Sequence, residues 1–235
     1  MATHATHAFA EPVALTTGSL TDDAPLVVLL HGRGSDERAI MGLAKALTRD
    51  AEYVALRAPI AEGGGYAWFE NRGIGRPVAE SLAATTAWFE DWLDALLAGE
   101  ASREVDGADE RVDERPIVLI GFSGGAAFAG GLVLRHPERY AGAAVLNGTL
   151  PFDAGVPTTP GRLEGTRLFV AQGDGDTVIP RELLDRTWEY AVVDSGAEVA
   201  THRSAGGHGL EPEVVDALAA WLDEVLGTSV ATDGD

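Results

Sequence analysis

The sequence contains no cysteine, and only one of its 17 basic residues, Lys45, is a lysine. The absence of cysteine excludes disulfide bonds, metal sites built from thiolates and a cysteine nucleophile. No apolar run approaches the roughly 18 residues that cross a bilayer, and residues 1–10 lack the basic start and continuous apolar segment of a secretory signal. We therefore expect a cytoplasmic protein without stable membrane association.

Positive charge is also scarce, because 37 acidic residues stand against those 17 basic ones and give a formal net charge of −20. Such a balance argues against nucleic acid and anionic membranes as partners. An ordinary acidic cytosolic protein could have this composition. A carboxylate-rich, lysine-poor surface is more typical of a halophilic protein, which stays dispersed in concentrated salt where its self-repulsion is screened. We favour the halophilic interpretation.

The length of 235 residues and the hydrophobic content of 46% suit one α/β domain over residues 1–235. We expect disordered tails at residues 1–8 and 228–235. His4 and His7 in the first tail have no third ligand nearby, so we expect no metal site. No cofactor is expected either, and the composition leaves open whether the chain forms a homo-oligomer.

Short apolar runs alternate with segments of helical periodicity along the whole chain. Since parallel strands covered on both faces are nearly continuous apolar runs, this alternation predicts an α/β fold with a mostly parallel central sheet and helices on both faces. The predicted strands cover residues 26–31, 53–56, 117–120, 141–146, 167–172 and 198–203, with an edge strand at 9–15. The predicted helices cover 36–49, 78–97, 124–136, 181–193 and 212–226, and residues 100–115 form a charged surface connection.

The segment Gly121–Gly125 fits the nucleophile elbow G-x-S-x-G. A glycine-flanked serine by itself is a common turn residue. Here a predicted buried strand precedes the motif and a predicted helix follows it, which is the context that the motif requires. The sequence therefore indicates that Ser123 is a nucleophile held above the edge of the sheet.

Other polar groups follow the later strands, and sites in such sheets form beyond the carboxyl ends of the strands. A serine nucleophile needs a base, and the base needs a carboxylate that fixes its tautomer. His208 can serve as the base, and either Asp174 or Asp176 can serve as the carboxylate. An N-cap aspartate or a turn histidine would be the plain alternative for each. The chain order Ser, Asp, His is the order of an α/β hydrolase.

The developing oxyanion needs two hydrogen-bond donors. One is the backbone N–H of the residue after the nucleophile, here Gly124, and the other comes from the loop after the strand at 26–31. That loop points to the backbone N–H of Arg33. We expect His31 to shape this loop rather than to act as a base.

The segment between residues 62 and 77 is long and mixes glycines with Tyr66, Trp68 and Phe69. Long irregular segments are usually functional or disordered, and aromatic rings favour a role in a substrate pocket. We therefore expect these three side chains to bind substrate. The alternative is that they only attach the loop to the core, and whether residues 60–78 form a mobile lid stays open.

Several of these segments together resemble the phospholipase/carboxylesterase family of α/β hydrolases, which includes the acyl-protein thioesterases. The resemblance covers nearly the whole chain. The matching segments are the oxyanion loop His31–Gly34, the aromatic segment Trp68–Glu70, the elbow Gly121–Gly125, the acid motif Gln172–Pro180 and the histidine motif Gly207–His208.

The resemblance implies that Asp176, rather than Asp174, is the acid of a Ser123–Asp176–His208 triad. Two residues depart from the family pattern, because Gln172 stands where the family has a histidine and Gly124 where it has a glutamine. We expect the chemistry to tolerate both departures.

The sequence thus predicts a serine hydrolase that cleaves small-molecule carboxylic esters, or thioesters, through an acyl-enzyme on Ser123. A dienelactone-hydrolase-like enzyme is one alternative, disfavoured because that family is similar but has a cysteine at the elbow. A noncatalytic ligand-binding relative is another, and it should lack a member of the triad, whereas all three are present here. The natural substrate and the acyl-chain length are not predicted.

Overall fold

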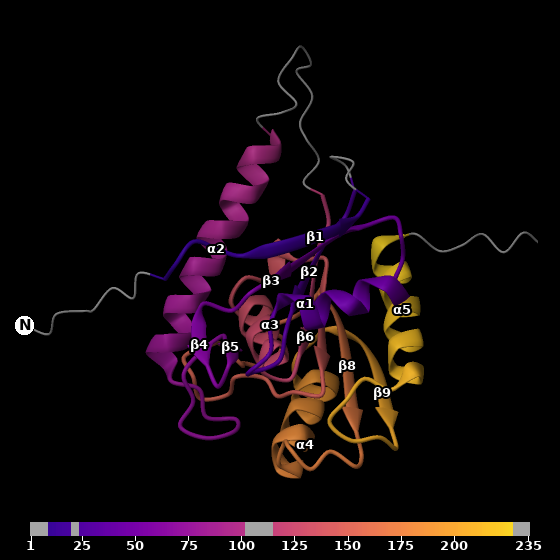
Figure 1. Cartoon of the computed structure of the whole chain (residues 1–235). Coiled ribbons are helices and arrows are strands. Elements are labelled where there is room, and N and C mark those ends of the chain that lie inside the picture. The colour runs from indigo at the N-terminus through magenta and orange to yellow at the C-terminus, as the bar shows by residue number, and fades with distance from the viewer. Residues whose placement is uncertain (1–8, 20–23, 102–114, 228–235) are drawn as a thin grey trace, which may run out of the picture.

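The computed structural model describes residues 9–19, 24–101 and 115–227 (Figure 1). The tails predicted at 1–8 and 228–235, and nearly all of the predicted charged connection, lie outside the described residues. The described chain folds into a central, mostly parallel sheet with helices on both faces, which confirms the predicted fold class.

The central sheet of the described chain has seven strands in the order β1-β3-β2-β6-β7-β8-β9. The pair β1 and β3 is antiparallel and the other neighbouring pairs are parallel. The carboxyl ends of the parallel strands therefore meet along one edge, toward which the arrows of β8 and β9 point in Figure 1. The strands are β1 (Ala14–Gly18), β2 (Leu26–Leu30), β3 (Glu52–Leu56), β6 (Ile117–Phe122), β7 (Gly142–Leu146), β8 (Arg167–Gly173) and β9 (Glu198–Ser204).

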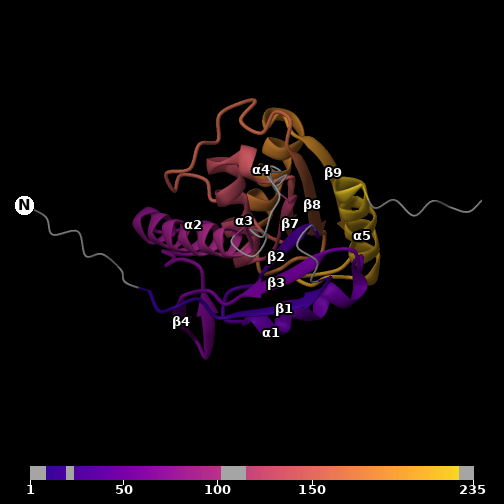
Figure 2. The same ribbon diagram turned by 90° about the horizontal axis from the view of Figure 1, so that it is seen from above.

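Helices cover the sheet in two layers, α2 and α3 on one face and α1 and α5 on the other (Figure 2). The covering α-helices are α1 (Glu37–Met41), α2 (Ala79–Ala101), α3 (Gly124–Arg135), α4 (Arg181–Glu189) and α5 (Pro212–Leu226). A 3₁₀ turn, η1 (Gly42–Ala46), extends α1, η2 (Pro137–Arg139) follows α3, and a π-helical turn, η3 (Tyr190–Asp194), extends α4. None of the helices in the described part of the chain is long and apolar enough to span a bilayer.

Strand β2 shows why the apolar runs in the sequence are continuous. Leu26, Val28 and Leu30 pack into the layer under α2 and α3, whereas Val27 and Leu29 pack into the layer under α1 and α5. All five side chains are fully buried. Burial of each stabilises the fold by about 1.5–3 kcal/mol, so both faces of the strand must be apolar.

The structure corrects two boundaries near the N-terminus. The edge strand predicted at 9–15 lies at Ala14–Gly18 instead, since Pro12 cannot donate to a ladder and Phe9 packs edge-on against Trp88, with ring centroids 6.2 Å apart. The helix predicted at 36–49 is capped by Asp36, whose side chain accepts the backbone N–H groups of residues 38 and 39. The α-helix ends at Met41, and the chain continues as a 3₁₀ helix from Gly42, because glycine destabilises an α-helix interior.

The segment predicted to be irregular contains a β-hairpin of β4 (Ile60–Glu62) and β5 (Gly65–Ala67). Its two-residue turn is Gly63-Gly64, with φ of 60° and 84°. Two consecutive positive φ values are the requirement of the tight hairpin turn that matches the twist of paired strands. The Gly-Gly pair was therefore a hairpin signal that the sequence analysis missed.

Candidate active site

The elbow follows β6 and precedes α3. Ser123 has φ 54° and ψ −113°, a strained backbone conformation that holds its hydroxyl clear of the sheet. The flanking glycines are required by close packing: a Cβ on Gly121 would lie 2.2 Å from the carbonyl oxygen of Gly125, and a Cβ on Gly125 would lie 2.1 Å from that of Leu30. The helix thus begins directly against the sheet with the serine at its N-terminus.

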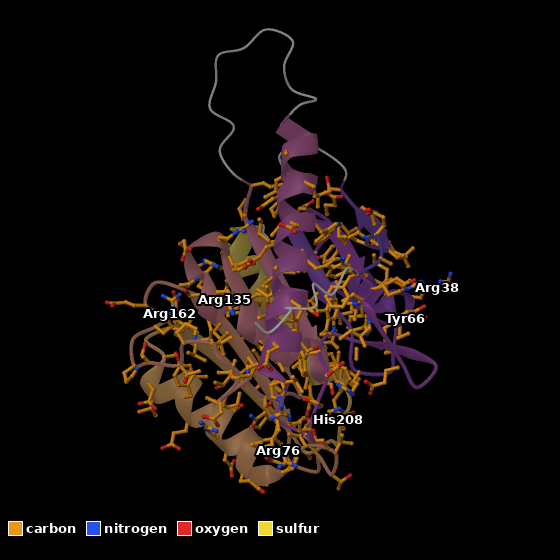
Figure 3. The ribbon with its side chains drawn as sticks, turned by 90° about the vertical axis from the view of Figure 1, so that its left-hand side faces the viewer. Arg38, Tyr66, Arg76, Arg135, Arg162 and His208 are labelled. Atoms are coloured by element: carbon orange, nitrogen blue, oxygen red, sulfur yellow. The ribbon has the colours of Figure 1, made fainter. Side chains whose placement is uncertain are left out.

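His208 lies between the serine and an aspartate, on the loop between β9 and α5. Its Nε2 atom lies 2.9 Å from Ser123 Oγ, and its Nδ1 atom lies 2.7 Å from Asp176 Oδ2. Figure 3 shows His208 at the end of the molecule that holds the carboxyl ends of the strands. The structure therefore brings together the three residues that the sequence singled out, from loops up to 85 positions apart.

Asp176, and not Asp174, is the aspartate in contact with His208. The Asp176 side chain is fully buried, and its second oxygen accepts the backbone N–H groups of Val178 and Ile179 at 2.8 and 3.0 Å. Burial raises the pKa of Asp176, but the hydrogen bonds from His208 and from the two backbone donors outweigh it, so the pKa lies below its usual value of 3.8. This carboxyl is therefore ionised at neutral pH.

Asp174 lies two residues away and points elsewhere. Its side chain is 54% exposed, and Oδ1 accepts Arg181 Nη1 at 3.2 Å on the outside of the loop. The backbone explains the separation: Gly173 and Gly175 lie against the carbonyls of residues 205–207, so the loop turns sharply and sends the two aspartates in different directions. The pattern Asp-Gly-Asp alone could not decide between them.

The two predicted oxyanion donors lie next to each other. A Cβ on Gly124 would lie 3.2 Å from the backbone nitrogen of Arg33. Gly124 is the first residue of α3, so its N–H has no carbonyl partner within the helix, and the positive end of the helix dipole lies there. Both N–H groups lie beside Ser123, where the oxyanion of a tetrahedral intermediate would form.

His31 supports the loop that carries Arg33. The imidazole is buried: Nδ1 lies 2.8 Å from the carbonyl oxygen of Gly32, and Nε2 accepts the backbone N–H of Ala58 at 3.1 Å. Burial lowers the pKa of His31, so the ring is neutral. A neutral ring with both nitrogens engaged is in keeping with the predicted role in shaping the loop.

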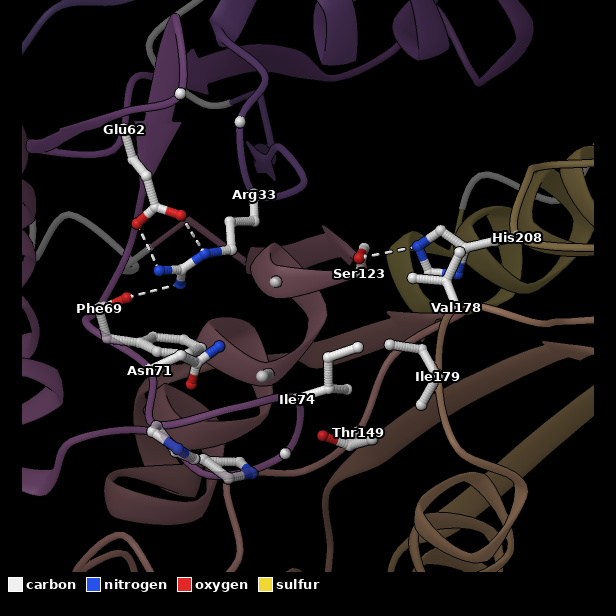
Figure 4. A pocket seen from close by; sticks show the side chains of 17 residues that line it. Arg33, Glu62, Phe69, Asn71, Ile74, Ser123, Thr149, Val178, Ile179 and His208 are labelled. Atoms are coloured by element: carbon white, nitrogen blue, oxygen red, sulfur yellow. Dashed lines mark hydrogen bonds and ion pairs between the residues drawn. The ribbon is translucent and has the colours of Figure 1, made fainter.

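A pocket of about 480 Å³ opens beside Ser123. Figure 4 shows Ile74, Val178 and Ile179 on its walls, together with the hydroxyl group of Thr149. Apolar groups therefore cover most of the surface that a substrate would contact, with a few polar groups among them. The complete lining comprises Arg33, Gly34, Glu62, Gly63, Phe69, Asn71, Ile74, Gly75, Pro77, Ser123, Gly124, Ala127, Thr149, Pro151, Val178, Ile179 and His208.

The predicted aromatic wall needs correction. Phe69 does line the pocket, but Trp68 is 1% exposed, stacks on Phe128 with ring centroids 4.7 Å apart, and donates Nε1–H to the carbonyl oxygen of His31 at 2.8 Å. Tyr66 packs against the core under the guanidinium of Arg57. For Trp68 and Tyr66 the alternative holds: they attach the loop to the core.

Asn147, which the sequence analysis did not single out, supports the histidine loop. It follows β7, is 1% exposed, and has a φ of 43°, which asparagine tolerates better than most residues. Its Nδ2 atom donates to the carbonyl oxygens of Gly207 and Gly209 at 3.0 and 2.8 Å, on either side of His208. Asparagine directly after a buried strand, at the sheet edge that carries the site, was the available signal.

Replacing Asn147 with glycine should lower kcat by about ten- to a hundredfold, because the two carbonyls lose their donor and His208 can shift by a fraction of an ångström. Glycine keeps the positive φ. Gln172→Met is the matched control, since this buried amide on β8 bonds the carbonyl oxygen of Leu184 and not the histidine loop. Steady-state kinetics and thermal melts are measured for both variants. If the two variants lose the same Tm and also the same kcat, Asn147 has no positioning role beyond stability.

No group of three or more His, Asp or Glu side chains that could hold a metal ion occurs in the described part of the chain.

Comparison with known proteins agrees with this geometry. A curated relative, the putative hydrolase MhqD of Bacillus subtilis, is 23% identical over 201 residues, which cover 86% of this chain and 94% of the relative. The crystal structure of a Bacillus cereus carboxylesterase is similar with a TM-score of 0.75, 25% identity, and coverage of 92% of this chain and 95% of the other. The crystal structure of a carboxylesterase from Mesorhizobium loti is similar with a TM-score of 0.68 and 27% identity, and the match covers 84% of this chain and 88% of the other.

The family model described as phospholipase/carboxylesterase matches residues 17–226, which include the elbow, both aspartates and His208. The chain therefore belongs to the phospholipase/carboxylesterase family of α/β hydrolases and is a hydrolase.

Proposed function

We propose that residues 1–235 act as one domain that hydrolyses carboxylic esters through an acyl-enzyme on Ser123. The observation that carries this proposal is the unbroken chain of hydrogen-bond contacts from Ser123 Oγ through His208 to Asp176, at 2.9 and 2.7 Å. Distances of this size allow direct proton transfer between serine and imidazole. A buried, ionised carboxylate behind the ring favours the imidazolium that forms.

The reaction proceeds in two halves. Ser123 Oγ attacks the ester carbonyl while His208 Nε2 takes its proton, and the N–H groups of Arg33 and Gly124 donate to the oxyanion. The tetrahedral intermediate collapses, His208 returns the proton to the leaving alcohol, and the acyl group stays on Ser123. A water molecule then gives a proton to His208, attacks the acyl carbonyl, and the carboxylic acid leaves as Ser123 recovers its proton.

Esters are favoured over thioesters as the substrate class. The carboxylesterases of Bacillus cereus and Mesorhizobium loti, at 25% and 27% identity, are named for ester chemistry. The maize acyl-protein thioesterase 2, at 20% identity and a TM-score of 0.68, shares the fold alone. A dienelactone-type enzyme and a noncatalytic relative fit less well, because the elbow carries a serine and all three triad residues are present.

A fluorophosphonate probe followed by intact mass and peptide mapping tests the proposal. We expect one probe molecule per chain, attached to Ser123, and turnover of p-nitrophenyl esters that falls with the same time course. A series of esters from acetyl to palmitoyl gives the preferred chain length. Stoichiometric labelling at any other residue, or turnover that survives full labelling, would refute the acyl-enzyme on Ser123.

We also propose that the protein is cytoplasmic and is adapted to high salt. The charge balance of 37 acidic to 17 basic residues, with one lysine, supports the halophilic part. Fractionation of the source cells tests the location.

Thermal stability should rise from low salt into the molar range of sodium chloride. About twenty uncompensated negative charges repel one another at low ionic strength, and the Debye length shrinks from about 10 Å at 0.1 M to about 3 Å at 1 M. Melting curves across a salt series measure the effect, with sucrose of equal osmolality as the control for general solute exclusion. A midpoint that stays flat or falls with salt would refute halophilic adaptation.

A further inference from the structure

The pocket contains one arginine and one acidic residue among its described lining, and the two bind each other. Arg33 lies on the oxyanion loop and Glu62 at the end of β4, 29 positions later. Figure 4 shows the guanidinium and the carboxylate meeting side by side at one side of the pocket. Since His208 is the one other lining residue with an ionisable acid or base group, this pair sets most of the charge that a substrate meets there.

Each nitrogen of the Arg33 guanidinium has a partner. Nε and Nη2 donate to the two carboxylate oxygens of Glu62, in the bidentate arrangement that arginine forms with carboxylates. Nη1 donates to the backbone carbonyl oxygen of Phe69 at 2.9 Å. Three of the guanidinium's five N–H donors are thus used, and the Nε/Nη2 fork, which could otherwise receive the carboxylate of a substrate, is occupied by Glu62.

The backbone keeps this pair in place. The Gly63-Gly64 turn directs β4 and β5 back toward the oxyanion loop, where Gly34 N–H donates to the carbonyl oxygen of Tyr66 at 2.8 Å. A Cβ on Gly65 would lie 2.1 Å from the carbonyl oxygen of Gly34, so the hairpin and the loop are in direct backbone contact. The side chains of Arg33 and Glu62 remain 32% and 39% exposed, which leaves them at the rim and within reach of a substrate.

We propose, on the basis of the proposed function, that Glu62 is a specificity-determining residue that occupies the Arg33 guanidinium, so that the enzyme selects uncharged esters over esters whose acyl group ends in a carboxylate. To bind the Nε/Nη2 fork, an anionic acyl group would have to displace Glu62 and would leave that carboxylate without its partner. It would also approach a chain with a net charge of −20. An uncharged acyl chain meets neither obstacle and contacts the apolar walls.

The test compares p-nitrophenyl butyrate with mono-p-nitrophenyl succinate, which have acyl groups of the same carbon number and differ by one carboxylate. Wild type should favour the butyrate in kcat/KM by about tenfold or more. In Glu62→Gln this ratio should fall by about ten- to a hundredfold, the size of one charge-assisted hydrogen-bonded pair. The ratio should fall because kcat/KM for the succinate rises. This rise should be absent from the double variant R33M/E62Q, which keeps the backbone N–H of residue 33.

Glu70→Gln is the matched control, because it removes the same charge from an exposed residue of the same segment that lines a separate depression with Phe9 and Ser81. Its butyrate-to-succinate ratio should equal that of wild type. The proposal is refuted if wild type cleaves both esters equally well, if Glu62→Gln leaves the ratio unchanged, or if Glu70→Gln lowers it as much. Wild type that cleaves neither ester would instead contradict the proposed function.

Discussion

Ser123→Ala should lower kcat for ester hydrolysis by a factor on the order of 10⁶, leaving the residual rate that oxyanion donors and binding alone can provide. The change removes one hydroxyl group from a residue whose backbone conformation is held by the packing around it. Binding of substrate should change much less, since the pocket walls remain. Loss of kcat at nearly constant KM is therefore the expected kinetic signature, measured with p-nitrophenyl butyrate.

Two controls support that measurement. The thermal midpoint of the variant should stay near that of wild type, because the atom that loses its partner, His208 Nε2, belongs to a residue lining the open pocket, where water can replace the hydroxyl group. Ser204→Ala is a useful second control, since it changes a buried serine on β9 that lies outside the contacts of Ser123 and His208. Ser123→Ala that retains wild-type activity would remove the serine from the mechanism.

Asp176→Asn should lower kcat by roughly 10⁴, because an amide in contact with Nδ1 stabilises the wrong histidine tautomer and no longer favours the imidazolium. The amide is nearly the same size as the carboxylate, and one side-chain oxygen can still accept the backbone N–H groups of Val178 and Ile179. The variant should therefore fold, and the loss should lie in catalysis rather than in stability.

Asp174→Asn is the matched variant two residues away and should reduce kcat by less than about threefold. Its carboxylate is about half exposed and pairs with Arg181 at the surface, where ion pairs contribute little. Kinetics on both folded variants decide the assignment. If Asp174→Asn caused the larger loss, the acid would be Asp174 and the contact between Asp176 and His208 would be structural.

The fold was predictable because its signals are local. The continuous apolar run of β2 is needed since the strand is buried on both faces, and the elbow glycines are needed since a Cβ at either would collide with backbone. Helix α5 has the predicted bounds, Pro212–Leu226, because a proline at the first turn and a glycine in the left-handed conformation at the end mark both of its limits. The Gly63-Gly64 hairpin was not predicted, because its signal lies in two turn glycines and not in an apolar run.

The residues of the candidate site also differ in how far the sequence predicts them. Residue types and chain order suffice to propose Ser123, His208 and one of two aspartates, because that chemistry needs a nucleophile, a base and an acid at successive strand ends. The choice between the aspartates needs either the family resemblance or the folded loop, where the glycine-packed backbone sends one carboxylate inward and the other to the surface.

Only the tertiary structure decides the remaining features, since they depend on contacts between distant segments. Trp68 belongs to the core and not to the pocket because Phe128 on α3 lies against its ring. Asn147 reaches carbonyls about 60 positions away, and Glu62 neutralises an arginine 29 positions before it. The sequence alone thus determines the fold class and indicates the candidate reactive groups, because these signals lie in short segments. The pocket walls, its charge and the supports of His208 are set by which surfaces the fold brings into contact.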